Sequence, residues 1–235
     1  MNPYMPTIIV ASANKHKIKE IKDILGSEFA VLDANSLPSI PDVIENGNTF
    51  KENAAKKAVE FANHVSSLYN SGKFNCLSFP IYVIADDSGL EVDALDGAPG
   101  VKSARFASLN NNNSACADNN SKLLSLLKDT PSERRSARFK CIIAILKIAN
   151  ENFLKHLADK YITDLLPSIV YFEGVCEGKI GFEPRGNKGF GYDPLFYPNG
   201  YDKTFAELGE EVKNKISHRA KALETFAKWL KEKKS

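Results

Sequence analysis

The chain carries, at residues 83–90, the stretch Val83-Ile84-Ala85-Asp86-Asp87-Ser88-Gly89-Leu90. The apolar run 81–85 predicts a buried strand, and we expect that strand to end at the adjacent carboxylates of Asp86 and Asp87. Open α/β sheets bind their ligands at the carboxyl ends of strands. The stretch therefore predicts an α/β fold with a ligand site at this pair.

The acidic residues around this pair favour a cation site. Five lie between Ala85 and Gly97 with no Lys or Arg among them: Asp86, Asp87, Glu91, Asp93 and Asp96. Adjacent carboxylates repel each other, so one must hold a proton or a cation must sit between them. Mg²⁺ is the usual occupant of an oxygen-only cluster. The alternative is a solvated acidic turn, which the position at a strand end disfavours.

Composition is that of a globular protein without a nucleic-acid partner. A chain of 235 residues buries about 70% of its unfolded surface in one large domain or two close lobes. The net charge is +2, from 31 basic and 29 acidic residues. That balance argues against a general nucleic-acid coat protein, which would carry a basic stripe.

Cysteine spacing and hydropathy favour the cytoplasm. The cysteines lie far apart and form no Cys-x-x-Cys pair: Cys76, Cys116, Cys141 and Cys176. This spacing indicates neither a zinc site nor a disulfide framework. Residues 1–6 lack the features of a signal peptide, and no apolar run approaches membrane-spanning length. We therefore expect a cytoplasmic protein with no membrane partner.

The first 65 residues predict a strand and two helices. A strand at 7–11 leads through the loop 12–17 to a helix with Ile18, Ile21 and Leu25 on one face. Backbone N–H groups at such a helix start attract phosphate. The loop lacks the glycines of a Walker motif, however, so the alternative is that it only connects the strand to the helix. Thr49 and Glu52 form a capping box, after which the apolar stripe is Ala54, Ala55, Ala58, Phe61, Ala62 and Val65. Glu45 precedes this helix in a loop that could bring a third carboxylate to the acidic pair.

The rest of the chain predicts one α/β domain over residues 1–235, with insertions near 66–80 and 150–168. A helix is expected to bury Leu123, Leu124, Leu126 and Leu127. A strand is expected to carry Phe139, Cys141, Ile143 and Ile145, followed by a strand pair at 170–172 and 175–180. A final helix over 216–231 is expected to bury Ile216, Ala220, Leu223, Phe226 and Leu230.

Two further clusters carry chemistry. In the first, Gly186-Asn187-Lys188-Gly189-Phe190-Gly191-Tyr192-Asp193-Pro194, the aromatic rings could stack on a base or close the core over a turn. In the second, Ser217-His218-Arg219 opens the last helix just after Lys213 and Lys215. Cations at a helix N-terminus are unfavourable because they oppose the helix dipole. Their presence here therefore indicates that an anion binds beside them. A basic surface turn is the alternative, and it suits Lys215 best.

Six motifs in fixed order carry a family resemblance: Ser12-x-Asn14-x-x-Lys17-x-x-Glu20, Glu45-x-Gly47-x-Thr49-Phe50-x-Glu52-Asn53-Ala54, Ala85-Asp86-Asp87-Ser88-Gly89-Leu90 continuing to Ser103-Ala104-Arg105-Phe106, Glu183-Pro184-Arg185-Gly186, Gly189-Phe190-Gly191-Tyr192-Asp193-Pro194 and Ile216-Ser217-His218-Arg219. They resemble the inosine triphosphate pyrophosphatase family. The resemblance covers nearly the whole chain apart from the two insertions.

This resemblance implies a long central mixed sheet flanked by helices, and two lobes with the active site in the cleft between them. It implies a homodimer, Mg²⁺ dependence and cleavage of ITP, dITP or XTP to the monophosphate and pyrophosphate, which clears deaminated purines from the nucleotide pool. The loop with Ser12, Asn14 and Lys17 matches the triphosphate-binding segment. Glu45 and Asp87 match magnesium-linked carboxylates, and Asp87 is the expected base.

The remaining roles follow from the same matches and from the negative charge of a triphosphate. We expect Asp86 to act with Asp87, and Lys57 with Lys17 to neutralise the triphosphate. Ser88 matches a substrate contact, and the nucleoside side comprises Phe190, Gly191, Tyr192, Asp193, Lys213, His218 and Arg219. Two alternatives stay open: a Maf-type pyrimidine nucleotide pyrophosphatase, and a non-catalytic nucleotide or nucleic-acid binding module.

Overall fold

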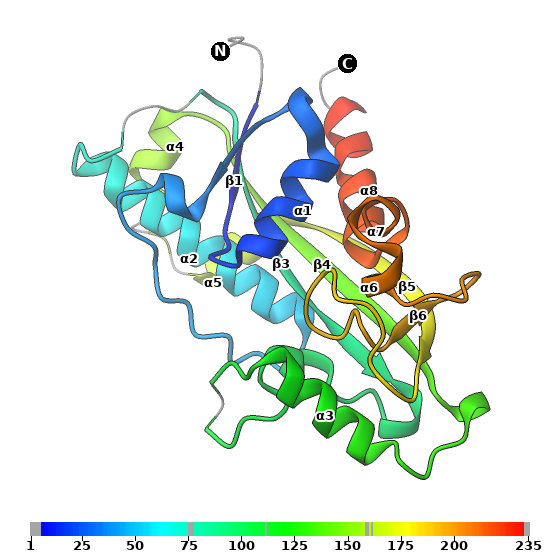
Figure 1. Cartoon of the computed structure of the whole chain (residues 1–235). Helices are drawn as coiled ribbons and strands as arrows, with labels where there is room; N and C mark the ends of the chain where they lie inside the picture. The colour runs from blue at the N-terminus through cyan, green and yellow to red at the C-terminus, as the bar shows by residue number, and fades with distance from the viewer. Residues whose placement is uncertain (1–5, 75–77, 111, 158–159, 161, 233–235) are drawn as a thin grey trace. The chain divides into compact units, whose positions relative to one another are not determined.

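A six-stranded sheet with strand order β2-β1-β3-β4-β5-β6 organises the computed structural model (Figure 1). The structure describes residues 6–74, 78–110, 112–157, 160 and 162–232. The strands are β1 (Thr7–Val10), β2 (Ala30–Asp33), β3 (Ile81–Val92), β4 (Ser136–Ile148), β5 (Ile169–Ile180) and β6 (Phe196–Pro198). β1 is parallel to β2 and β3, whereas β5 and β6 are antiparallel. The predicted α/β class with a central mixed sheet is confirmed.

Eight α-helices are described in this structure: α1 (Lys15–Leu25), α2 (Phe50–Asn70), α3 (Cys116–Leu126), α4 (Glu151–Lys155), α5 (Ile162–Leu165), α6 (Phe205–Leu208), α7 (Glu210–Ile216) and α8 (His218–Glu232). Over the described ranges, none of the helices is both long and apolar enough to cross a membrane.

The chain divides into two compact units. Unit 1 comprises Met1–Asp87, Ile142–Phe172 and Leu223–Ser235, and unit 2 comprises Ser88–Cys141 and Glu173–Ala222. β3, β4, β5 and α8 therefore each contribute residues to both units. The single domain over 1–235 and a cleft between lobes stay predictions.

The core of unit 1 is formed as the sequence predicts. Ile18, Ile21 and Leu25 of α1 are buried, and so is the whole predicted stripe of α2. The capping box joins Thr49 and Glu52 in both directions. On α8, Phe226 and Trp229 pack edge-to-face or tilted against Tyr82 of β3 and Phe172 of β5. These contacts pack α8 against β3, the strand that carries the acidic pair, and against β5.

In unit 2, a close approach of α8 to β5 places the start of that helix. A Cβ atom on Gly174 would overlap the backbone carbonyl oxygen of His218 and the backbone nitrogen of Ala222. Only glycine therefore fits at this point of β5. The close contact fixes the backbone from which His218 and Arg219 project.

Three predicted boundaries are wrong. β3 does not end at Asp86 but continues to Val92. Leu90 and Val92 are buried in the core of unit 2, and the free energy of this burial outweighs the low strand propensity of Asp, Ser and Gly. The predicted strand pair is the single strand β5. The last helix starts at His218 rather than at residue 216, because Ser217 is extended and its hydroxyl accepts a hydrogen bond from the Ala220 N–H.

The predicted burial is wrong in part. Leu123 of α3 and Leu127, the C-cap of this helix, lie one turn apart and are fully buried, but Leu126 is half exposed on another face. Ile216 is only partly buried, whereas Ala220, Leu223, Phe226 and Leu230 are buried as expected.

The two predicted insertions contact each other in unit 1. α2 runs to Asn70, so the first five residues of the segment 66–80 are helical and belong to α2. The buried Ser66 hydroxyl donates to the Leu154 carbonyl at 2.5 Å, and the Asn70 amide donates to the Lys155 carbonyl at 2.8 Å. Residues 75–77, with Cys76, and residues 1–5 lie outside the described residues.

Candidate functional site

Asp86 and Asp87 lie inside β3 at the end of the unit 1 portion of this strand, and both are buried, with 3% and 7% of their surface exposed. Buried charges must be paired or must change protonation. The Lys17 ammonium, from the first turn of α1, forms an ion pair with the Asp86 carboxylate. The structure thus brings together the predicted phosphate loop and the acidic pair.

Lys57 is the second cation in unit 1. Its buried ammonium lies 3.0 Å from the Asp86 carbonyl oxygen and 3.0 Å from Glu45 Oε1. The sequence left open whether Glu45 would join the acidic residues. Its link to Lys57 brings it into the electrostatic environment of Asp87.

Burial raises the pKa of Asp87 from its ordinary value of 3.8 to about 6. The charges of Lys57 and Lys17 act in the opposite direction, whereas those of Glu45 and Asp86 raise the pKa further. A carboxyl group with this pKa is ionised at neutral pH and is more basic than an exposed aspartate. It is thus suited to accept a proton from a water molecule.

The loop before α1 is ordered by its own polar side chains. Asn14 caps the helix, because its Oδ1 accepts hydrogen bonds from the N–H groups of His16 and Lys17 at 3.0 and 3.1 Å. The Asn14 N–H in turn donates to the Ser12 hydroxyl at 3.2 Å. This capping presents Lys17 at a helix N-terminus, where an anion is favoured.

Asn53 is a residue of this region for which no role was predicted. It is buried on α2, and its Oδ1 accepts a hydrogen bond from the Gly47 N–H at 2.7 Å. The Nδ2 atom has no hydrogen-bond partner among the described residues. Asn53 thereby holds the loop that carries Glu45. A polar residue within the apolar stripe of α2 was the signal that could have found it.

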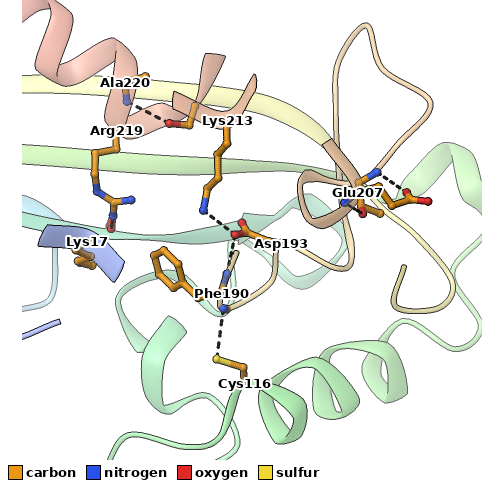
Figure 2. A network of polar contacts seen from close by, with 12 residues as sticks. Lys17, Cys116, Phe190, Asp193, Glu207, Lys213, Arg219 and Ala220 are labelled. Carbon is orange, nitrogen blue, oxygen red and sulfur yellow. Dashed lines mark hydrogen bonds and ion pairs between the residues drawn. The ribbon is translucent and has the colours of Figure 1, made fainter. Parts of the chain in front are cut away.

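In unit 2, the predicted glycine cluster forms a loop over residues 186–193, here called the glycine loop. Asp193 is buried at the end of this loop, and its Oδ2 accepts hydrogen bonds from the Phe190 N–H at 2.9 Å and from Lys213 Nζ at 2.6 Å. Figure 2 shows the Lys213 side chain reaching Asp193 beside the Phe190 ring. The ammonium lies 4.4 Å from the centre of that ring, a cation–π contact.

The two aromatic residues of the glycine loop differ in their surroundings. Tyr192 is buried in the core of unit 2, and its hydroxyl donates to the Ser103 carbonyl at 2.9 Å. Its ring therefore closes the core, as one of the two interpretations held. Phe190 is only partly buried, so its ring is the better candidate for stacking on a base.

The basic residues at the start of α8 are buried and do not form a surface turn. Arg219 is 1% exposed, and its Nη2 donates to the Ser88 hydroxyl at 2.9 Å. The His218 ring stacks on the Phe139 ring, with centroids 4.9 Å apart. Lys215, by contrast, is exposed and paired with Glu211, as a plain surface residue would be. Unit 2 thus contains the predicted substrate contact Ser88 and the predicted nucleoside contacts Phe190, Asp193, Lys213, His218 and Arg219.

Comparison with known proteins agrees with these observations. A model described as the Ham1 family matches residues 8–229. The dITP/XTP pyrophosphatase of Desulforamulus reducens is 45% identical over 217 residues, which cover 92% of this chain and 91% of that protein. The dITP/XTP pyrophosphatase of Halalkalibacterium halodurans is 42% identical over 223 residues, which cover 94% of this chain and 97% of that protein.

Solved structures show the same relationship. The structure of a HAM1 protein from Coxiella burnetii matches with a TM-score of 0.74 and 37% sequence identity, covering 97% of this chain and 100% of that one. The resemblance inferred from the six sequence motifs is thereby confirmed. The chain belongs to the Ham1 family.

Proposed function

We propose that this protein hydrolyses non-canonical purine nucleoside triphosphates, namely dITP, ITP and XTP, to the monophosphate and pyrophosphate, and so removes deaminated purines from the nucleotide pool. The relatives that match almost the whole chain are dITP/XTP pyrophosphatases. The observation that carries the proposal is the buried Asp87 carboxyl group, whose pKa is raised to about 6 and whose charge interacts with those of Lys17 and Lys57.

In the proposed reaction, Asp87 accepts a proton from a water molecule as the water oxygen attacks the α-phosphorus. The bond between the α-phosphorus and the bridging oxygen breaks, and pyrophosphate leaves. Phosphoryl transfer depends mainly on positioning and charge stabilisation, so no covalent nucleophile is needed. Lys17 and Lys57 supply positive charge for the triphosphate, and the capped N-terminus of α1 adds backbone donors.

The donor set of unit 1 fits Mg²⁺. Its ligands would be oxygen atoms, and the negative charges of Glu45 and Asp86 both raise the pKa of Asp87, which is the signature of a site that favours a cation. Among the described residues there is no group of three or more acidic, His or Cys side chains arranged around a metal. Mg²⁺ needs only one or two carboxylates besides phosphate and water. Glu45 and Asp87 would hold the ion, which would polarise the phosphate when bound.

For base selection, we propose that Phe190 stacks on the purine, with Gly191, Tyr192 and Asp193 supporting it. Lys213, His218 and Arg219 would supply donors to the carbonyl oxygen at position 6. An amino group at that position, as in ATP, leaves a buried donor unpaired, at a cost of about 1–3 kcal/mol. Such a mismatch favours dITP over dATP.

We further propose a cytoplasmic homodimer without nucleic-acid or membrane partners. In the part of the chain that the structure describes, Cys116 and Cys176 are free thiols, which supports a reducing compartment. The family resemblance supports the dimer, which sedimentation would test.

A nucleotide panel assayed for pyrophosphate, with and without Mg²⁺, tests the function. We expect rapid Mg²⁺-dependent release from dITP, ITP and XTP and slow release from dATP. Preferential hydrolysis of dTTP and UTP would instead identify a pyrimidine nucleotide pyrophosphatase of the Maf type. Binding of ITP without hydrolysis would identify a non-catalytic module.

A further inference from the structure

We propose that Asn120 and Cys116, two side chains of α3, are positioning residues for nucleotide binding that hold the glycine loop through both backbone polar groups of Gly191. The inference rests on the proposed function, because this loop carries Phe190 and Asp193. It assigns a role to a helix that none of the six sequence motifs includes.

The two contacts between α3 and Gly191 are complementary, because one engages the backbone N–H and the other the backbone carbonyl. The Gly191 N–H donates to Cys116 Sγ at 3.3 Å, and Asn120 Nδ2 donates to the Gly191 carbonyl at 3.2 Å. Figure 2 shows the first of these contacts below Phe190. Residues 116 and 120 are four apart, so their side chains project from the same face of α3.

Gly191 is the point at which the loop most needs such support. Its φ of 64° lies in the left-handed region, and glycine has more alternative conformations than any other residue. The Gly191 N–H and the Phe190 carbonyl belong to one peptide plane, and that carbonyl accepts a hydrogen bond from the Asp193 N–H at 3.3 Å. The bond to Cys116 therefore also orients the turn between Phe190 and Asp193.

Asn120 is a poor choice for stability alone. It is 7% exposed, and its Oδ1 has no hydrogen-bond partner within the described ranges of the chain. A buried acceptor without a partner destabilises the fold, whereas an apolar side chain of similar size would extend the stripe of Leu123 and Leu127. The donor that Asn120 offers to Gly191 explains why an amide stands here.

Loss of this support has a specific kinetic consequence. Phe190 and Asp193 are assigned to the nucleoside, whereas the proposed base and the cations for the triphosphate are Asp87, Lys17 and Lys57. A weaker hold on Gly191 should therefore raise KM for dITP about five- to tenfold and leave kcat within about twofold. Inhibition by inorganic tripolyphosphate, which has no sugar or base, should not change.

The experiment compares Asn120→Ala and Asn120→Asp with Asn119→Ala. Asn120→Asp keeps the size of the side chain but removes the donor. Asn119 is equally buried on α3, but it bonds to the backbone of Ala107 and Ala104 and not to the glycine loop. We expect a raised KM in both Asn120 variants and an unchanged KM in Asn119→Ala, even where its melting temperature falls further. An equal KM increase in all three variants, or a parallel change in tripolyphosphate inhibition, overturns the inference.

Two variants of Cys116 give an independent test of the inference. Cys116→Ser keeps an acceptor for the Gly191 N–H and should preserve KM within about twofold, whereas Cys116→Val removes the acceptor and should raise KM.

Amide hydrogen exchange of residues 186–193, without nucleotide, should be faster in Asn120→Ala and Cys116→Val than in the wild type or Asn119→Ala. If the wild type releases no pyrophosphate from dITP, the proposed function is wrong, and exchange alone then decides whether α3 holds the loop. Unchanged exchange overturns the inference.

Discussion

The Lys57 ammonium lies 3.0 Å from the backbone carbonyl oxygen of Asp86, deep in unit 1. From there its charge lowers the pKa of Asp87, against the larger effect of burial. Replacing Lys57 with Met should therefore raise the pKa of Asp87 further. Because the base acts only when ionised, the acidic limb of the profile of log(kcat/KM) against pH should lie at higher pH in Lys57→Met than in the wild type.

Lys56 provides the control for this prediction. It lies next to Lys57 on α2 but contacts Asn46 and Glu60 instead of the acidic pair. Lys56→Met should keep the acidic limb of the wild type. Overlapping pH profiles for Lys57→Met and the wild type would show that Lys57 does not act on the base.

Asp87→Asn should abolish activity and stabilise the fold above pH 6. Activity should fall by about 100- to 10,000-fold, the usual contribution of a general base. In the folded protein Asp87 keeps its proton up to a pKa of about 6, whereas the unfolded chain ionises near 3.8. The wild type therefore loses stability as pH rises from about 4 to about 6, by on the order of 2–3 kcal/mol, and the amide does not ionise.

Urea unfolding at pH 4.5 and pH 8, in buffer with EDTA, measures this difference. We expect the gain in stability of Asp87→Asn over the wild type to be larger at pH 8. A gain that is the same at both pH values would contradict the raised pKa, and near-normal pyrophosphate release would contradict the assignment of the base.

If Glu45 holds Mg²⁺ as proposed, Gly47→Ala should lower the apparent affinity of the enzyme for Mg²⁺. A Cβ atom on Gly47 would lie 2.8 Å from Asn53 Oδ1 and 2.8 Å from the Glu52 Cβ, so the loop with Glu45 must move. We expect the Mg²⁺ concentration for half-maximal activity to rise severalfold, with little change at saturating Mg²⁺. Asn48→Ala, in the same loop and exposed, should titrate like the wild type.

Arg219→Ala should lower base selectivity. If Arg219 reads the carbonyl at position 6, its loss should reduce the ratio of kcat/KM for dITP over dATP about tenfold or more. Parallel loss of activity on both nucleotides would instead make Arg219 a phosphate-binding residue. Lys215→Ala, which removes an exposed cation three residues earlier than His218, should not change the ratio.

Local signals in the sequence predicted the helices well. The Thr49–Glu52 capping box and the spacing of Ile18, Ile21 and Leu25 depend on residues within a few positions, so they could be found without the fold. The end of β3 could not be found in this way, because the burial of Leu90 and Val92 depends on a core built from distant segments. Ser217 is a related case, since its extended backbone and its cap on α8 interrupt an otherwise periodic helical pattern.

The candidate site also contains residues that sequence motifs predict and residues that only the fold reveals. Asp87, Lys17 and Arg219 could be named from motifs that unite residue type and order. Asn120 could not, because its partner Gly191 lies 71 positions away and only the fold brings them together. The pKa of Asp87 was equally out of reach, since it depends on how deeply β3 is buried.

The contact between α2 and α4 bears on how this chain could be shortened. Truncating 150–168 alone would remove the Leu154 and Lys155 carbonyls that accept hydrogen bonds from Ser66 and Asn70, and would uncover the end of α2 that they contact. A minimal version of the enzyme should therefore trim both extra segments together, because each of them supplies part of the contact between α2 and α4.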